Sequence, residues 1–159
     1  MCIPHEGKSD LDKSVTRKLK EWRVPGDRFV IVRDNDNADC VALKSRYVAL
    51  CSASGRPESL VRLVCQELET WYLGDLWAMA QAFLQPNLDT PGFRKRFAEP
   101  DSWQKPSIEV ERLVADFGKV AGARAMAVYL RAGEHNRSAS FKAFTIGVHR
   151  VALEMGWSN

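Results

Sequence analysis

Hydrophobic residues in the first half of the chain are spaced as in alternating strands and helices. After Ser9, a good N-cap, apolar side chains recur on one helical face until Pro25 and Gly26 break the pattern. The β-branched run Arg28–Arg33 predicts a central strand that is buried on both faces. The predicted strands cover residues 1–4, 28–33 and 60–65, and the predicted helices cover residues 9–22, 41–52 and 66–83. This alternation favours a parallel sheet with right-handed crossovers.

The second half of the chain has a different pattern. Residues 85–106 are rich in proline and glycine and predict an irregular segment. Three helical stretches follow, near residues 107–117, 121–131 and 138–154. We therefore predict a single α/β domain with an α/β core over residues 1–85, an irregular loop over 86–106 and a helical tail over 107–159.

Composition and charge narrow the class of protein without indicating a function. The 159 residues, 45% hydrophobic and 27% charged, suit one globular domain. A net charge of +3 allows binding to a polyanion but does not argue for it. No apolar run is long enough for a membrane span or a signal peptide, so we expect a cytoplasmic protein without a membrane partner. The four cysteines form no CxxC pair, which is typical of reduced thiols, and neither common Gly-rich phosphate loop occurs.

Acidic residues gather after the predicted strands. Glu6 follows the first strand, Asp34, Asp36 and Asp39 follow the second, and Glu67 and Glu69 follow the third. Because functional groups collect beyond the carboxyl ends of parallel strands, we expect these side chains to meet at one edge of the sheet. Carboxylate oxygens are the ligands that Mg²⁺ and Mn²⁺ prefer, and without a cation the crowded carboxylates would raise each other's pKa.

Each of these carboxylates also has a structural explanation. Asp39 would serve equally well as the N-cap of the next helix, and Glu67 and Glu69 would be favourable solvated groups at a helix start. A turn rich in Asp and Asn needs no metal, although Asp34 and Asp36 follow a fully apolar strand, which favours a functional site. The basic run at residues 94–96 could contact phosphates or simply be solvated.

Several segments together resemble one bacterial family. The matching stretches are EGKSDLDK, RDNDNADC, LVRLVCQELETWYLGD, GARA at 122–125 and NRSASFKAF at 136–144, which span nearly the whole chain. The family is grouped as a domain of unknown function and is related to the Toprim (topoisomerase–primase) fold. The resemblance implies a Toprim-like parallel sheet with flanking helices and a helical C-terminal tail. It also implies that Asp34 and Asp36 match the DxD pair that holds magnesium.

The resemblance allows two alignments for the Toprim glutamate that makes or breaks phosphodiester bonds. In one, EGKSD matches the first Toprim motif and Glu6 is the catalytic residue. In the other, which we favour, Glu6 follows the family's second strand, and this chain lacks the first strand and its glutamate. The sheet would then have an unpaired edge, and a homo-oligomer or a partner chain would be expected to cover it.

The leading hypothesis is a Mg²⁺- or Mn²⁺-dependent phosphodiester-cleaving enzyme that acts on nucleic acid, of a type suspected of roles in phage defence. Its catalytic residues would be Glu6, Asp34 and Asp36, its metal ligands Asp34, Asp36 and Asp39, and its accessory residues Lys8, Arg33, Glu67 and Glu69. The alternative is a non-catalytic metal- or partner-binding subunit of the same fold. A haloacid-dehalogenase-like phosphatase is disfavoured, because Asn37 and Ala38 stand where it would have Thr or Val.

Overall fold

The computed structural model describes residues 1–157, except for the side chain of Lys8, and shows a mixed α/β fold that is mostly helical. The first elements are α1 (Lys8–Glu21), β1 (Val30–Asp34), α2 (Cys40–Ala53) and β2 (Leu60–Val64). They are followed by α3 (Glu69–Leu73), α4 (Leu76–Ala82), α5 (Pro91–Arg96), α6 (Pro106–Leu113), α7 (Lys119–Ala127) and α8 (Ala139–Glu154). Three short 3-10 helices lie between them, η1 (Pro86–Leu88), η2 (Pro100–Ser102) and η3 (Gly133–His135).

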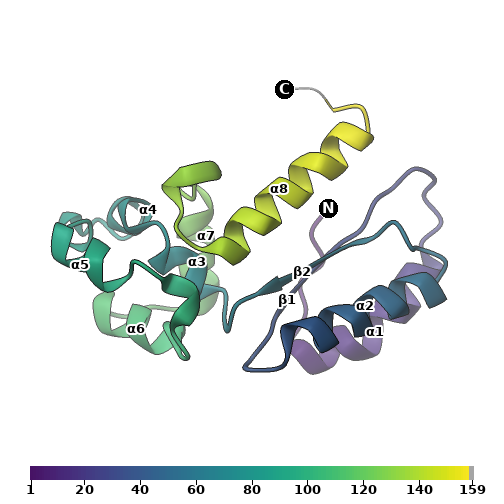
Figure 1. The fold of residues 1–159 in the computed structure, drawn as a ribbon, viewed down its shortest axis with the longest axis horizontal. Coiled ribbons are helices and arrows are strands. Elements are labelled where there is room, and N and C mark those ends of the chain that lie inside the picture. The colour runs from purple at the N-terminus through teal and green to yellow at the C-terminus, as the bar shows by residue number, and fades with distance from the viewer. Residues whose placement is uncertain (158–159) are drawn as a thin grey trace.

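β1 and β2 form a parallel sheet in which Val30 pairs with Leu60 and Asp34 pairs with Val64. α2 is the crossover between the strands. α1 and α2 lie on one face of the sheet, and α8 lies on the other (Figure 1). Successive side chains of a strand point to opposite faces of the sheet. Ile31 points to the face covered by α1 and α2, where it belongs to a hydrophobic cluster. The other buried members of this cluster are Val15, Leu19, Leu43, Tyr47, Cys51 and Val61.

Two sequence-based predictions about the sheet are wrong. Residues 1–4 form no strand, and among residues 1–157 only β1 and β2 are paired in a sheet. β1 is therefore not a central strand buried on both faces. Val30 and Val32 remain 38% exposed, because α8 packs mainly on β2 and leaves the same face of β1 partly open.

The helices predicted over residues 9–22, 41–52 and 138–154 are confirmed as α1, α2 and α8, but the one over 66–83 is interrupted. It forms two short helices, α3 and α4. Asp75 accepts a hydrogen bond from Ala78 N at 3.0 Å and thereby starts α4 as a new helix. Gly74 lies against the side chain of Asn136, where a Cβ would have no room.

The segment over residues 86–106 was predicted to be irregular, but it contains α5 and two 3-10 helices. Thr90 accepts a hydrogen bond from Phe93 N at 3.3 Å, and Pro91 occupies the first turn of α5. A cap followed by proline is a favourable helix start, so even this short stretch becomes helical.

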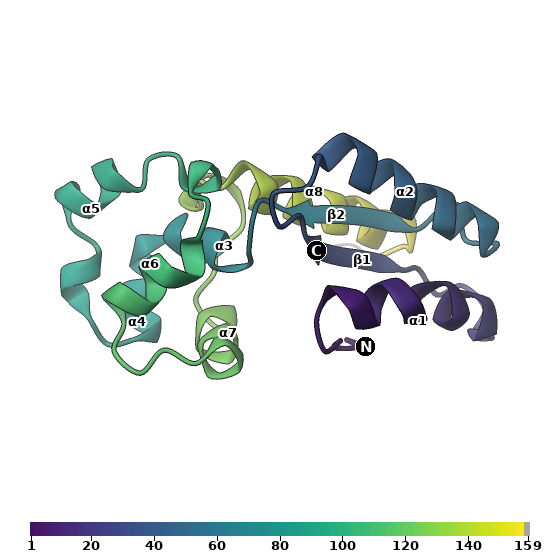
Figure 2. The ribbon, with the colours of Figure 1, turned by 90° about the horizontal axis from the view of Figure 1, so that it is seen from below.

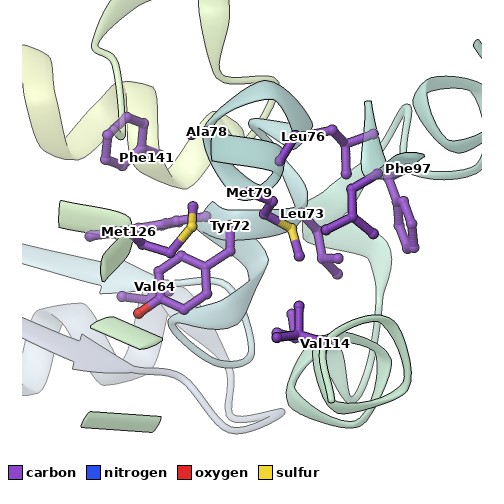
Figure 3. Close-up of a cluster of buried hydrophobic side chains, with 14 residues drawn as sticks. Val64, Tyr72, Leu73, Leu76, Ala78, Met79, Phe97, Val114, Met126 and Phe141 are labelled. Atoms are coloured by element: carbon purple, nitrogen blue, oxygen red, sulfur yellow. The ribbon is translucent and has the colours of Figure 1, made fainter. Parts of the chain in front are cut away.

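α3 to α7 form a helical region beyond the carboxyl ends of the strands (Figures 1 and 2). Its core is the cluster of buried side chains shown in Figure 3, where Tyr72, Leu73 and Met79 lie close together. Val64 of β2 and Phe141 of α8 belong to the same cluster, so the helical region and the sheet share part of their packing. Among the described residues, no helix has the length and apolar character needed to cross a membrane.

α8 connects the two parts of the molecule. Near its start, Ser140 Oγ accepts a hydrogen bond from Trp71 Nε1 at 2.9 Å, and Phe144 stacks on the Trp71 ring at a centroid distance of 4.9 Å. The carbonyl of Ala143, the residue before Phe144, accepts a hydrogen bond from Arg62 Nε of β2 at 2.8 Å. α8 thus contacts both α3 and the sheet.

Candidate functional site

The loops after β1 and β2 are joined by Asn35, the residue that follows Asp34. Asn35 is buried, and its backbone N donates to Val64 O at 3.0 Å. Its side-chain Oδ1 accepts from Gln66 N at 2.5 Å, while Nδ2 donates to Ala38 O at 3.1 Å. An asparagine side chain can donate and accept at once, so one residue fixes both loops relative to each other. The two strand ends are therefore held as one unit.

Asp36 and Asn37 turn the chain sharply after Asn35. Their φ angles are 47° and 63°, in the left-handed region that Asp and Asn tolerate better than most residues. Asp36 N donates to Gln66 O at 3.3 Å, and Asn37 N donates to Gln66 Oε1 at 3.0 Å. The turn therefore runs alongside the loop after β2, where Glu67 follows Gln66.

Four carboxylates influence one another at these strand ends. Asp34 is partly buried, and its pKa is raised to about 7, mainly because burial removes hydration from the charged form. Repulsion from Asp36, Glu69 and Glu67 is part of this rise, and the charge of Lys119 opposes it. Glu69, the first residue of α3, is almost fully buried, and its pKa is raised mainly by that burial. This part of the molecule disfavours negative charge and would favour a bound cation.

Two residues of the helical region contact these carboxylates. Lys119 Nζ of α7 lies 3.9 Å from Glu67 Oε1 and 3.8 Å from Glu69 Oε1. Ser107 N, in the first turn of α6, donates to Glu67 Oε2 at 3.0 Å. Glu67 therefore also satisfies a helix N-terminus, which needs acceptors for its unpaired N–H groups.

A cavity of about 260 Å³ opens between the strand-end loops and the start of α6. Its lining residues are Asp36, Asn37, Gln66, Glu67, Gln104, Lys105, Ser107 and Ile108. We refer to this cavity, together with the carboxylates of Asp34, Asp36, Glu67 and Glu69, as the acidic cleft. It combines acidic groups with Lys105 on its wall and Lys119 beside Glu67 and Glu69.

Two of the predicted site residues have structural roles. Asp39 accepts a hydrogen bond from Ala42 N at 2.8 Å and caps α2, the alternative that the sequence left open for it. Arg33 precedes Asp34 on β1 and so points to the opposite face of the sheet. Its guanidinium lies 5.5 Å from the centre of the Tyr47 ring, and its Nε lies 3.5 Å from Asp12 Oδ1.

The structure does not place the two N-terminal candidates, Glu6 and Lys8, among these carboxylates. Glu6 is exposed on the turn before α1, and its backbone N donates to Asp10 Oδ2 at 3.2 Å. The backbone of Lys8 starts α1, but its side chain lies outside the described part of the chain. The structure therefore brings Asp34, Asp36, Glu67 and Glu69 together, and it places Asp39 and Arg33 in the framework.

The donor chemistry of the acidic cleft fits a hard divalent cation, although its geometry is open. Among the described residues, no group of three His, Cys, Asp or Glu side chains is arranged to hold a metal ion. Mg²⁺ is commonly bound through one or two carboxylates, with water and substrate phosphates completing its shell. Asp34 and Asp36 are the residues that would hold such an ion.

Sequence reasoning missed Asn35, Lys105 and Lys119. An Asn between two Asp residues at a strand end is a recognisable turn signal, so Asn35 could have been found. The two lysines come from segments 40 or more residues beyond the end of β2, and the hydrophobic pattern does not show that they approach the strand ends.

Comparisons of the chain with protein-family models, curated proteins and solved structures found no match. The Toprim resemblance thus stays a prediction.

Proposed function

We propose that the chain is a Toprim-like, Mg²⁺- or Mn²⁺-dependent phosphodiester-cleaving enzyme that acts on nucleic acid at the acidic cleft. The observation that supports this most directly is Asp34, a partly buried carboxyl at a strand end whose pKa is raised to about 7 by burial and by three acidic neighbours. The negative charge of such a group is unfavourable by itself and becomes favourable when a bound cation neutralises it.

Asp34 and Asp36 would bind the ion, with Glu67 and Glu69 adding negative charge around it. When bound, the ion would supply Lewis-acid stabilisation to the oxygens of a phosphodiester. Lys105 lines the cavity and Lys119 lies near Glu67 and Glu69, so both are available to pair with phosphates of the backbone. Because the pKa of Asp34 is close to neutrality, this carboxyl would bind the ion in competition with a proton.

A second candidate is a non-catalytic metal- or partner-binding subunit of the same fold. Lys119 favours it, because an internal cation already lies 3.8 Å from Glu69 and partly offsets the acidic charge. The position of Glu6 also favours it, since this residue is exposed on a turn rather than buried in the cleft. In this case the cleft would bind an ion or a partner without cleaving a substrate.

Metal titration and plasmid nicking together separate the two candidates. We expect Mn²⁺ and Mg²⁺ to bind the wild type in calorimetry and to bind Asp34→Asn and Asp36→Asn at least about tenfold more weakly. Glu58→Gln is the matched control, because Glu58 is exposed at the opposite end of the sheet.

Nicking that needs the ion and is lost in Asp36→Asn would support the enzyme. The same assay on Glu6→Gln asks whether Glu6 contributes to cleavage. Metal binding without nicking would favour the non-catalytic subunit. Equal heats for the wild type and both aspartate variants would overturn the metal site.

A further inference from the structure

A second cavity of about 260 Å³ lies at the other end of α3, away from the acidic cleft. The junction of α3 and α4, α5 with the residues that flank it, and the segment between α7 and α8 form its walls. Its charged lining residues are Asp75, Asp89, Arg94, Arg131, Glu134 and Arg137. Arg131 and Arg137 come from the segment between α7 and α8, and Arg94 comes from α5, which is distant in the sequence. We refer to this cavity as the guanidinium pocket.

Arg131 is held in place from behind. Its Nη2 donates to Asp75 Oδ1 at 2.9 Å and its Nε donates to Asp75 Oδ2 at 3.3 Å. Asp75 is only 2% exposed and also caps α4, so it is a fixed anchor. The guanidinium lies 4.0 Å from the centre of the Trp77 ring, a close cation–π contact. Arg131 is therefore preorganised before any ligand arrives.

Arg94 and Arg137 are oriented in a similar way. Arg94 makes two hydrogen bonds to the Asp89 carboxylate, both of 2.7 Å. Arg137 Nη1 donates to the backbone carbonyl of Arg94. Arg94 holds the pKa of Asp89 below its usual value through its hydrogen bonds, and Arg131 and Arg137 lower it further by their charge. All three guanidinium groups therefore act on the same small region.

The charges of the pocket favour an anion. Its three guanidinium groups carry more positive charge than the carboxylates of Asp75 and Asp89 neutralise. Glu134 does not offset the difference, because its side chain is 96% exposed and pairs with Lys142 Nζ at 3.1 Å. Each paired arginine uses its Nε and one Nη2 hydrogen on its carboxylate, and the other N–H groups of the fork remain for a further acceptor. Planar forks of this kind suit phosphate oxygens.

We propose that the guanidinium pocket binds a phosphate group, either as free phosphate or as the terminal phosphate of a nucleic acid strand. Arg94, Arg131 and Arg137 donate to its oxygens. Ion pairs that served only to join loops would close the space between them, whereas here a cavity remains among the arginines. The proposal does not depend on the proposed function, because phosphate binding needs neither a metal ion nor the acidic cleft.

The test is a titration of the ¹⁵N-labelled full chain with inorganic phosphate at constant ionic strength, followed by NMR. We expect saturable shifts of the Arg94, Arg131 and Arg137 Nε–H signals and of the Trp77 indole signal. Arg137→Gln should weaken phosphate binding at least about tenfold, since a charge-assisted hydrogen bond is lost. Arg94→Gln, a second exposed position, should act in the same direction. Arg17→Gln on α1 is the matched control and should bind like the wild type.

The source of the phosphate is tested with an oligonucleotide carrying or lacking a 5′-phosphate. Tighter binding of the phosphorylated strand, with displacement by inorganic phosphate, would identify a nucleic acid end as the ligand. Saturable binding of inorganic phosphate with no preference between the two strands would identify free phosphate. Shifts that do not saturate, or that are unchanged in both Arg137→Gln and Arg94→Gln, would overturn the proposal.

Discussion

The α/β layer and the helical region of this molecule differ in the size of their hydrophobic clusters and in how fully their apolar faces are covered. The helical region has the larger hydrophobic cluster, to which α3, α4, α6, α7 and α8 all contribute. The α/β layer has a smaller cluster, restricted to the face covered by α1 and α2. Its other face is covered mainly along β2, and Val30 and Val32 of β1 remain partly exposed.

This difference shows where the α/β layer obtains its support. A two-stranded sheet is marginal by itself and needs helices on its faces. Here α8 supplies the second cover, and α8 is itself anchored in the helical region through Trp71. The acidic cleft lies where the two regions meet, so its geometry depends on both. Four substitutions test this dependence, from the largest expected effect to the smallest.

Trp71→Ala should cause the largest loss of stability, because it removes the contact that ties α8 to α3. Trp71 is 5% exposed, contacts both Phe141 and Phe144, and donates to Ser140 Oγ. We expect a loss of about 3–5 kcal/mol in the free energy of unfolding, measured with urea. Trp157→Ala, at an exposed tryptophan, should change it by less than about 0.5 kcal/mol. A loss below about 1 kcal/mol for Trp71→Ala would contradict its anchoring role.

Asp34→Asn should stabilise the metal-free protein at alkaline pH. The folded-state pKa of about 7 exceeds the ordinary value of 3.8, so the folded state binds the proton more tightly than the unfolded state. The wild type should therefore lose stability as pH rises from about 4 to about 7. The asparagine variant should lose less. At pH 8 we expect a gain of about 1–3 kcal/mol, below the full value of the shift because the carboxyl is partly solvated.

Urea unfolding of both proteins in a chelator at several pH values measures this difference. Parallel stability curves across this range would show that Asp34 titrates normally. Adding Mg²⁺ should then stabilise the wild type but not the variant, since a ligand that binds only the folded state raises its stability.

Gly147→Ala should test how closely α8 approaches the sheet. A Cβ at Gly147 would lie 2.5 Å from Arg62 Nη2, and Arg62 is held by its bond to Ala143 O. We expect a loss of about 1–2 kcal/mol, because overpacking outweighs the better helix propensity of alanine. In an Arg62→Met background, the same substitution should become stabilising by up to about 1 kcal/mol. The same sign in both backgrounds would mean that the close approach has no energetic consequence.

Val32→Lys should have the smallest effect on folding and a clear effect on association. Val32 is 38% exposed on a strand that pairs on one side only in the described part of the chain, so stability should change by about 0.5 kcal/mol or less. We predict that the wild type self-associates through this edge and that lysine prevents it. Sedimentation velocity over a range of concentrations measures this, with Val41→Lys on α2 as control. A wild type that is monomeric throughout would refute the prediction.

The fold could be predicted where neighbouring residues in the sequence indicate a single type of secondary structure. The break at Pro25 and the β-branched run around Ile31 correctly predicted the end of the first helix and a strand. Ser9 was predicted as the N-cap of that helix, but it lies inside α1, whose N-cap is Gly7. The break between α3 and α4 was missed because both helices bury residues in the same cluster, so the apolar pattern continues across it. Burial of β1 on both faces was wrong because an apolar run does not reveal how many strands a sheet has.

In the candidate site, too, residues next to the strands could be predicted from the sequence, whereas residues brought in by tertiary packing could not. The rule that parallel strands end together led to the prediction that Asp34, Asp36, Glu67 and Glu69 lie near one another, and the last three do act on Asp34. The same rule was applied to Glu6, but residues 1–4, which precede it, form no strand. Lys119 was not, because its approach depends on how α7 packs in the helical region. The guanidinium pocket was also missed, since its arginines come from α5 and from the segment between α7 and α8, which only the fold brings together.

The hydrogen bond between Arg62 and Ala143 has a consequence for the order of folding. Its two residues are 81 positions apart, so forming it closes a long loop of chain. Closing a loop costs entropy that grows with the logarithm of its length, and contacts of this kind form slowly in an extended chain. If α3 to α7 condense first, the effective loop becomes much shorter. We therefore expect α8 to dock on β2 late, with the second face of the sheet remaining exposed in the species that precede the native state.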